Sequence, residues 1–411
     1  MEQEEKQQQR GSDTSGGETS TQTPQNPLVT QGSNSKWLDV QQKVLVPIRA
    51  TMNFRTLRDM YGEVVLDPGR LKFVSLLGEG NYGTVSKYEY TDLDKKKTYV
   101  ALKRLKPGVV SAQDMLDFMR EVKILKKLRH SRIANFRGTG YLPPEEEGGE
   151  EDAFLAQDLV EGGSLRTLLE KQMKSPKEKL YTLGDAITWL LDVARGLKYL
   201  HQAEPQVIHR DLKLENIMLT LDREARLVDF GLHKVIDKWD REGAGEEAMF
   251  DMTGGTGALM YMPPEAMLGT KYNHKVDVYS FSIIAWELLH HEMLIARICK
   301  SSNAQRDLRN YAKYVAHEAY RPPISATLPG PVAELISDCW QEDPMKRPEF
   351  ADLVPRLMKI KEEVKTMEAE APPPPERQRS GSSWLSGISA TRNKKETKKD
   401  KGERKTCFWC F

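Results

Sequence analysis

The chain has few cysteines and no long apolar run. Only four of its 411 residues are cysteines, at positions 299, 339, 407 and 410, too few for a disulfide framework, and no histidines complete a metal-ligand set with them. This pattern predicts a reducing, cytoplasmic location. No stretch of about 18 apolar residues occurs. The N-terminus lacks a basic and then apolar signal pattern, and Glu2 excludes N-myristoylation, so we expect neither a membrane span nor a secreted protein.

A net charge of one sign is also lacking. The chain has 61 Lys and Arg against 60 Asp and Glu, a formal net charge of +1. No overall field therefore attracts nucleic acid, and we expect no nucleic-acid partner. The hydrophobic content of 39% and charged content of 29% are typical of a folded centre with polar ends.

The composition divides the chain into a centre and flanking segments. Residues 1–35 hold almost no large apolar side chains and are predicted to be a disordered tail. Residues 36–70 regain apolar content and are expected to form an extension that packs on the following domain. Folded character fades after residue 364 into a Pro-, Ser- and Gly-rich linker at 365–391, and a basic tail occupies 392–411.

The centre begins with strand patterns and continues with helix patterns. Short β-prone runs are separated by Gly or charged turns, at 73–77, 84–90, 98–105 and 153–160. One helical periodicity, at 111–129, interrupts them. Beyond Gly162-Gly163 the pattern is mainly helical, with clear examples at 184–201, 276–291 and 332–340. These patterns predict a small sheet-rich half with one helix, followed by a larger helical half.

A glycine-rich segment lies between the first two predicted strands. It matches G-x-G-x-x-G-x-V in Gly78-Glu79-Gly80-Asn81-Tyr82-Gly83-Thr84-Val85. Spaced glycines alone often make only a tight turn. A dinucleotide fingerprint would lie between a strand and a helix, so this position favours a hairpin whose backbone N–H groups cover phosphates. We expect this segment, with Leu77 before it and Ala101 on the third strand, to bind ATP.

A lysine on the third predicted strand follows at a characteristic spacing. Lys103 ends Val100-Ala101-Leu102-Lys103, and a lysine in such a strand could simply extend its ammonium group to solvent. Its spacing after the glycine segment instead indicates a group that neutralises the α- and β-phosphates. Glu121, eighteen residues further on in the predicted helix, is the expected ion-pair partner.

Two short segments carry the groups for phosphoryl transfer. In His209-Arg210-Asp211-Leu212-Lys213-Leu214-Glu215-Asn216, Asp211 can accept the proton of an attacking hydroxyl. Lys213 can stabilise charge on the transferring group. Asn216 and Asp229, the latter in Asp229-Phe230-Gly231, offer oxygen ligands suited to Mg²⁺. Isolated Asp and Asn residues usually cap turns, but their joint occurrence in this order favours catalysis.

Taken together, these motifs resemble those of a eukaryotic protein kinase, over residues 71–364. The resemblance implies an α+β, bilobal fold with an N-lobe at about 71–157 and a C-lobe at about 162–364. It is closest to the tyrosine-kinase-like group of serine/threonine kinases, on the segments Ile187-Thr188-Trp189, Tyr261-Met262-Pro263-Pro264-Glu265 and Cys339-Trp340. ATP, Mg²⁺ and protein substrates are the implied ligands and partners.

The same resemblance implies several supporting contacts. Glu265 is expected to pair with Arg347, and Asp277 to brace the backbone of the catalytic loop. Gln157 is expected at the back of the adenine pocket, with backbone groups of Asp158 and Val160 at the adenine edge. A stacked apolar spine is implied for Leu125, Phe136, His209 and Phe230.

Alternatives remain open for the hydroxyl that accepts the phosphoryl group and for whether the chain is catalytically active. Lys213, two residues after Asp211, favours serine/threonine hydroxyls over tyrosine, with a dual-specificity or tyrosine kinase as an alternative. Ala258 occupies a position where serine/threonine kinases usually carry a hydroxyl. This departure leaves room for a pseudokinase that acts as a nucleotide-binding scaffold. Arg210 suggests that phosphorylation in the activation segment is sensed, with Thr253 and Thr256 as candidates.

The C-terminal tail combines basic charge with cysteines. Residues 392–405 contain eight Lys or Arg and three acidic residues, and the chain ends Cys407-Phe408-Trp409-Cys410-Phe411. Such a charge run is usually only a solvated tail. Here we also expect peripheral association with an anionic membrane surface, in which acylation of Cys407 or Cys410 adds the second anchoring signal.

Overall fold

The computed structural model describes most of the central part of the chain, with several gaps. It describes residues 65–80, 83–105, 118, 121–143, 152–230, 234–236, 258–270 and 272–370. All of these residues lie in one of the two units into which the chain divides, the unit that begins at Met52. The structural statements below concern these residues.

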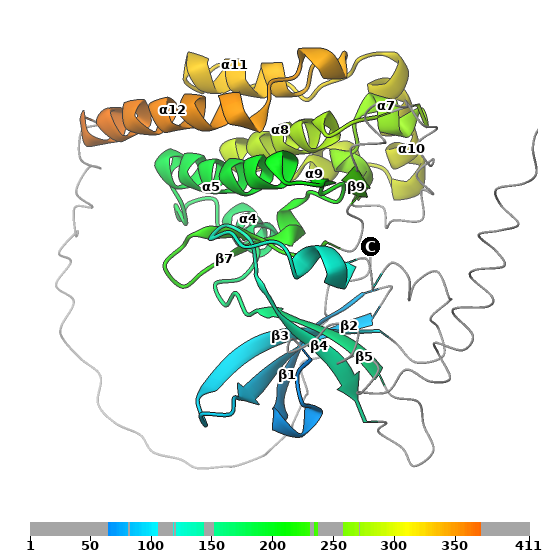
Figure 1. Cartoon of the computed structure of the whole chain (residues 1–411). Coiled ribbons are helices and arrows are strands. Elements are labelled where there is room, and N and C mark those ends of the chain that lie inside the picture. Colours follow the sequence, from blue (N-terminus) through cyan, green and yellow to red (C-terminus); the bar gives the residue numbers. More distant parts are fainter. Residues whose placement is uncertain are drawn as a thin grey trace, which may run out of the picture. The chain divides into compact units, whose positions relative to one another are not determined.

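A five-stranded antiparallel sheet forms the first half of the described chain. Its strands are β1 (Leu71–Gly80), β2 (Gly83–Thr91), β3 (Lys97–Leu105), β4 (Phe136–Leu142) and β5 (Asp152–Asp158). They lie in the order β1-β2-β3-β5-β4 (Figure 1). The four strands expected from the sequence correspond to β1, β2, β3 and β5. Residue 118 and residues 121–125 are helical, within the expected helix at 111–129.

Strand β4 was not expected from the sequence. Its two glycines, Gly138 and Gly140, lower strand propensity and hide the alternation of apolar and polar residues. Tertiary contacts explain the glycine at 140, because a Cβ there would approach the ring of Phe154 to 2.7 Å. Residues 65–70 run beside β4, where Leu66 is buried and its N–H donates to the carbonyl of Thr139 at 2.9 Å. That described part of the predicted extension therefore packs on the sheet.

The second half is mainly helical. Its helices are α4 (Leu165–Lys174), α5 (Leu183–Gln202), α7 (Pro264–Met267), α8 (Lys275–His290), α9 (Leu294–Ile298), α10 (Ala304–His317), α11 (Gly330–Cys339) and α12 (Phe350–Glu370). Helix α5 begins with a capping box between Thr182 and Asp185. Helix α8 is buried on all sides from Lys275 to Leu289, so it forms the centre of this half. Helix α5 packs against both α8 and α12 (Figure 1).

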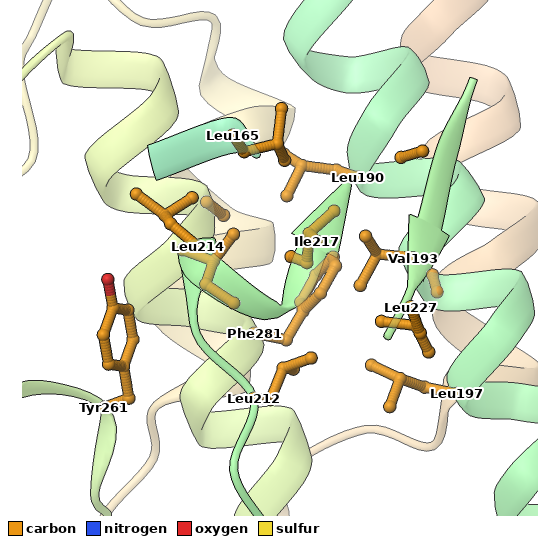
Figure 2. Packing of buried hydrophobic residues seen from close by; sticks show 14 of the residues in the cluster. Leu165, Leu190, Val193, Leu197, Leu212, Leu214, Ile217, Leu227, Tyr261 and Phe281 are labelled. Atoms are coloured by element: carbon orange, nitrogen blue, oxygen red, sulfur yellow. The ribbon is translucent and has the colours of Figure 1, made fainter. Parts of the chain in front are cut away.

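Two small sheets connect the helices to the loops of the candidate site. Strand β6 (Gln206–Ile208) pairs with β9 (Lys234–Ile236), and β7 (Ile217–Leu219) pairs with β8 (Ala225–Leu227). Figure 2 shows Ile217 and Leu227 packed beside Val193 and Leu197 of α5 and Phe281 of α8. The loop between β6 and β7, which includes a 3₁₀ turn at Leu214–Asn216, is thereby attached to the core at both ends.

Helix α12 corrects one predicted boundary. The predicted linker began at residue 365, but the helix continues to Glu370. Val364 is its last buried residue, so burial does not explain the extra turns. The final six residues, Lys-Thr-Met-Glu-Ala-Glu, are mostly strong helix formers without glycine or proline. Glu368 also accepts a hydrogen bond from the N–H of Gly184 at 3.1 Å. Among the described helices, none is long and apolar enough to cross a membrane.

Candidate active site

The buried carboxylate of Asp277 holds the loop after β6. It accepts the N–H groups of His209 and Arg210, each at 2.9 Å, and contacts His201 Nε2 at 2.8 Å. Burial alone would raise the pKa of Asp277, but the bond from His201 and the other donors lower it, so the group is ionised at neutral pH. Arg210 adopts a positive φ of 67°, which these hydrogen bonds stabilise.

Asp211 lies in this loop between a lysine and an asparagine. Its Oδ2 is 2.7 Å from Lys213 Nζ and accepts a hydrogen bond from Asn216 Nδ2 at 3.0 Å. Asn216 Nδ2 also donates to the Asp211 carbonyl at 2.8 Å. Burial lowers the pKa of Lys213, but the Asp211 carboxylate outweighs it and raises the pKa above the ordinary value. The loop therefore holds a carboxylate and a permanently charged ammonium group side by side.

Lys103 connects three elements. Lys103 is on β3, and its Nζ is 2.8 Å from Oδ1 of Asp229, which lies in the loop after β8. The same Nζ is 3.3 Å from Oε2 of Glu121, which lies in the helix at 121–125. Burial opposes protonation, but the carboxylates of Asp229 and Glu121 raise the pKa of Lys103 above its ordinary range. For Glu121, burial raises the pKa and outweighs the charge of Lys103, which lowers it. The expected Lys103–Glu121 contact is present, and the shorter contact to Asp229 was not anticipated.

The adenine side of the predicted nucleotide site lies at the end of β5. The N–H of Asp158 donates to the carbonyl of Asn135 at 2.9 Å. The side chain of Asp158 contacts Asn135 and Arg137. Gln157 is buried, with Nε2 donating to the carbonyl of Ala134.

The strand register aligns the other predicted nucleotide-binding residues. Val85 lies opposite Lys103, and Ala101 lies opposite Gln157. Gly78 pairs with Val85, and Gly80 pairs with Gly83 across the turn of the β1–β2 hairpin. The side chain of Leu77 is exposed. Three other predicted members, Glu79, Thr84 and Val160, lie on β1, on β2 and just after β5.

Residues that the resemblance placed in supporting roles are also in contact. Arg347 is fully buried, and its two terminal nitrogens lie 2.6 Å and 2.8 Å from the carboxylate oxygens of Glu265. The rings of His209 and Phe230 lie 5.0 Å apart. Leu125, Phe136 and Phe230 belong to one buried cluster.

Several predicted residues lie outside the described part of the chain. They are Asn81 and Tyr82 of the glycine segment, the candidate phosphorylation sites Thr253 and Thr256, and the candidate acylation sites Cys407 and Cys410. Ala258 begins a 3₁₀ turn at Ala258–Tyr261, but its side chain is also outside the description.

A buried carboxyl group that was not expected from the sequence lies next to this turn. Glu287 of α8 accepts hydrogen bonds from the Tyr261 hydroxyl at 2.7 Å and from the N–H of Leu294 at 2.8 Å. Burial raises its pKa to about 7, against these two hydrogen bonds. A glutamate in the apolar run Ile283-Ile284-Ala285-Trp286-Glu287-Leu288-Leu289 was the available signal. Such a residue needs polar partners when the helix is buried.

Replacing Glu287 by glutamine is expected to flatten the pH dependence of stability. A folded pKa of about 7, above the ordinary 4.5, means that the unfolded chain ionises first, so native stability falls as the pH rises from 4.5 to 7. The full loss is about 3 kcal/mol. Urea denaturation at pH 5 and pH 8 measures it. We expect the wild type and a control, Glu363→Gln on the exposed face of α12, to lose stability over this range, and Glu287→Gln to lose clearly less. Equal losses in all three proteins would contradict the assignment.

Comparison with known proteins agrees with this geometry. A sheet-rich lobe, a helical lobe and the Lys103, Asp211 and Asp229 constellation define the protein kinase class. A family model for protein tyrosine and serine/threonine kinases matches residues 71–357, well over half of the chain. The chain belongs to this family and has its bilobal fold.

The chain is similar to several longer kinases. It is 33% identical over 303 residues to the serine/threonine-protein kinase VIK of Arabidopsis thaliana, which covers 72% of this chain and 62% of the relative. It is 31% identical over 294 residues to the serine/threonine-protein kinase TNNI3K of Rattus norvegicus, covering 71% and 31%. It is 30% identical over 302 residues to the dual specificity protein kinase shkE of Dictyostelium discoideum, covering 73% and 38%. The prediction that this chain resembles the tyrosine-kinase-like group of serine/threonine kinases is confirmed. The chain spans less than two thirds of the length of each of these relatives.

Proposed function

We propose that this protein is an active protein kinase that transfers the γ-phosphoryl group of ATP to serine and threonine hydroxyls of protein substrates. The observation that carries the proposal is the loop of Asp211, in which a carboxylate, the ammonium group of Lys213 and the amide of Asn216 are in direct contact. A pseudokinase scaffold needs none of these groups in contact.

Each group in the loop has a distinct role in the proposed reaction. Asp211 accepts the proton of the acceptor hydroxyl. Lys213 stays charged, because the Asp211 carboxylate raises its pKa, and it stabilises negative charge on the transferring group. Lys103 neutralises phosphate charge, and Glu121 keeps its ammonium group in place.

The donor set of the site fits Mg²⁺. Both described hydrogen bonds of the Asn216 amide use its nitrogen, so its oxygen is the atom left for a cation. The carboxylate of Asp229 supplies a second oxygen, and its side chain is about half exposed, at 45%. Oxygen ligands of this kind suit Mg²⁺, which would neutralise phosphate charge there. We assign Asn216 and Asp229 as the residues that would hold it.

Serine and threonine are proposed as acceptors because lysine stands two residues after Asp211. The names of VIK and TNNI3K favour the same acceptors, and the name of shkE keeps dual specificity as the second candidate. Incubation of the full chain with labelled ATP, Mg²⁺ and a mixed peptide library, followed by phosphoamino-acid analysis, tests the proposal. We expect labelled phosphoserine and phosphothreonine, with Asp211→Asn as the background. Phosphotyrosine would support dual specificity, and label no greater than this background would support the scaffold.

A further inference from the structure

A cluster of two histidines and a glutamate lies away from the catalytic groups. One potential ligand atom from each of His201, His274 and Glu349 lies within 4.8 Å of the other two. His201 lies in the last turn of α5, His274 directly precedes α8, and Glu349 directly precedes α12. The chain thus brings together three helix ends that are far apart in the sequence.

His201 has the hydrogen bonding of a metal ligand. Its Nε2 is 2.8 Å from the carboxylate of Asp277, so Nδ1 is the nitrogen left for a metal. Nδ1 is buried and has no hydrogen-bond partner among the described residues. A histidine that binds a metal typically donates its other N–H to a carboxylate in this way. Without a metal, this buried Nδ1 lacks a hydrogen bond, which lowers the stability of the folded protein.

His274 and Glu349 supply the other two ligands. His274 Nε2 lies 3.0 Å from Glu349 Oε1 and 2.9 Å from Glu349 Oε2. The ammonium group of Lys275 contacts Oε1 at 2.6 Å. The ion would therefore bind His274 Nε2 and Glu349 Oε2 in place of the hydrogen bond between these two atoms.

We propose that His201, His274 and Glu349 form a binding site for a divalent transition-metal ion, with Zn²⁺ as the best-fitting ion. Two imidazoles and one carboxylate suit Zn²⁺ and exclude sites of the Mg²⁺ or Ca²⁺ kind, which use oxygen ligands. The side chains of His274 and Glu349 are 20% and 43% exposed, so a solvent molecule can complete a tetrahedron. Metal–ligand distances of about 2.0–2.2 Å require ligand atoms about 3.4 Å apart. One nitrogen of each histidine and one Glu349 oxygen lie within 4.8 Å of one another, so they have to close by at most about 1.4 Å. His274 Nε2 and Glu349 Oε2, 2.9 Å apart, have to separate by about 0.5 Å. Side-chain rotation can supply both movements.

The site would connect the helical core to the catalytic loop. An ion there would join the ends of α5, α8 and α12 and would fix the tautomer of His201 that donates to Asp277. Asp277 in turn holds the N–H groups of His209 and Arg210. Metal binding would therefore stabilise the native helical half, and this readout does not depend on kinase activity.

Metal titration of the full chain tests the proposal. Because Cys407 and Cys410 could bind Zn²⁺ themselves, both are first replaced by serine, and the chelator-treated protein is titrated with Zn²⁺ against a chromophoric competitor, without nucleotide. We expect one equivalent to bind and the melting temperature to rise. His274→Gln and Glu349→Gln should each weaken binding at least tenfold and abolish the rise.

A matched histidine variant controls for non-specific binding. His317→Gln, on the exposed end of α10, should bind Zn²⁺ like the parent. Circular dichroism of the metal-free variants verifies their folding, and Glu349→Gln alone decides the test if His274→Gln does not fold. Substitution with Co²⁺ should give the visible bands of a tetrahedral nitrogen and oxygen site. Binding well below one equivalent, or equal affinity in Glu349→Gln and His317→Gln, would overturn the proposal.

Discussion

Replacement of Asp211 by asparagine is expected to lower the rate constant of phosphoryl transfer by about 10²–10⁴-fold, the usual contribution of a general base. Asparagine has nearly the same shape and can still accept a hydrogen bond from Lys213, which lies 2.7 Å from the carboxylate. It cannot accept the proton of the attacking hydroxyl. The loss should therefore appear in kcat, with ATP affinity close to that of the wild type. Steady-state kinetics and equilibrium ATP binding measure the two quantities separately.

A surface aspartate provides the matched control for this prediction. Asp222 lies exposed in the turn between β7 and β8, so Asp222→Asn makes the same chemical change away from the site. Its kcat should equal that of the wild type. A kcat for Asp211→Asn within tenfold of the wild-type value would show that Asp211 is not the proton acceptor. A parallel loss of ATP affinity would instead indicate a disturbed nucleotide site.

Replacement of Arg347 by methionine is expected to destabilise the protein by about 3–5 kcal/mol. Arg347 is fully buried, and the change leaves the carboxylate of Glu265, about 8% exposed, without its bidentate partner. Arg347 also donates to the carbonyls of Gln341 and Lys275, and these acceptors lose a partner as well. Urea denaturation, followed by circular dichroism, measures the change in the free energy of unfolding.

Two further variants distinguish the effect of an unpaired buried charge on stability from the effect of losing any ion pair. Arg356 forms a surface pair with Asp338 at 2.9 Å, with the two side chains 36% and 46% exposed. Arg356→Met should therefore cost no more than about 1 kcal/mol. The double variant Glu265→Met/Arg347→Met removes both charges and should regain part of the stability lost in Arg347→Met. Equal destabilisation by Arg347→Met and Arg356→Met would refute the argument from burial.

Much of the candidate site could be predicted because its motifs are local. Asp211, Lys213 and Asn216 lie within six residues, and backbone geometry brings such neighbours together in a single loop. The strands around the glycine segment could be predicted from their alternation and their glycine boundaries, and the strand register then places Val85 opposite Lys103. Strand β4 could not be predicted, because two glycines weaken its pattern and one of them, Gly140, is explained only by its close tertiary contact with Phe154.

The Glu265–Arg347 pair was expected only from resemblance to a family, whereas Glu121 was expected from its place in the predicted helix. Nothing in the residues themselves selects Arg347 among the many arginines of the chain. Glu287 could have been noticed as a lone carboxyl group in an apolar run. Its partner, Tyr261, lies 26 residues away and follows from the packing of the 3₁₀ turn against α8.

The sequence by itself determined the class of fold and the order of the candidate catalytic groups, and it indicated the phosphoryl-transfer chemistry that we propose, because these depend on composition, periodicity and short spacings. The tertiary structure alone decided which distant groups meet. It placed Lys103 against Asp229, 126 residues away, and gathered His201, His274 and Glu349 at three helix ends. The physical reason is that closing such long loops costs entropy, which only the burial of the whole core offsets. These contacts therefore depend on how every helix packs, and no local pattern specifies them.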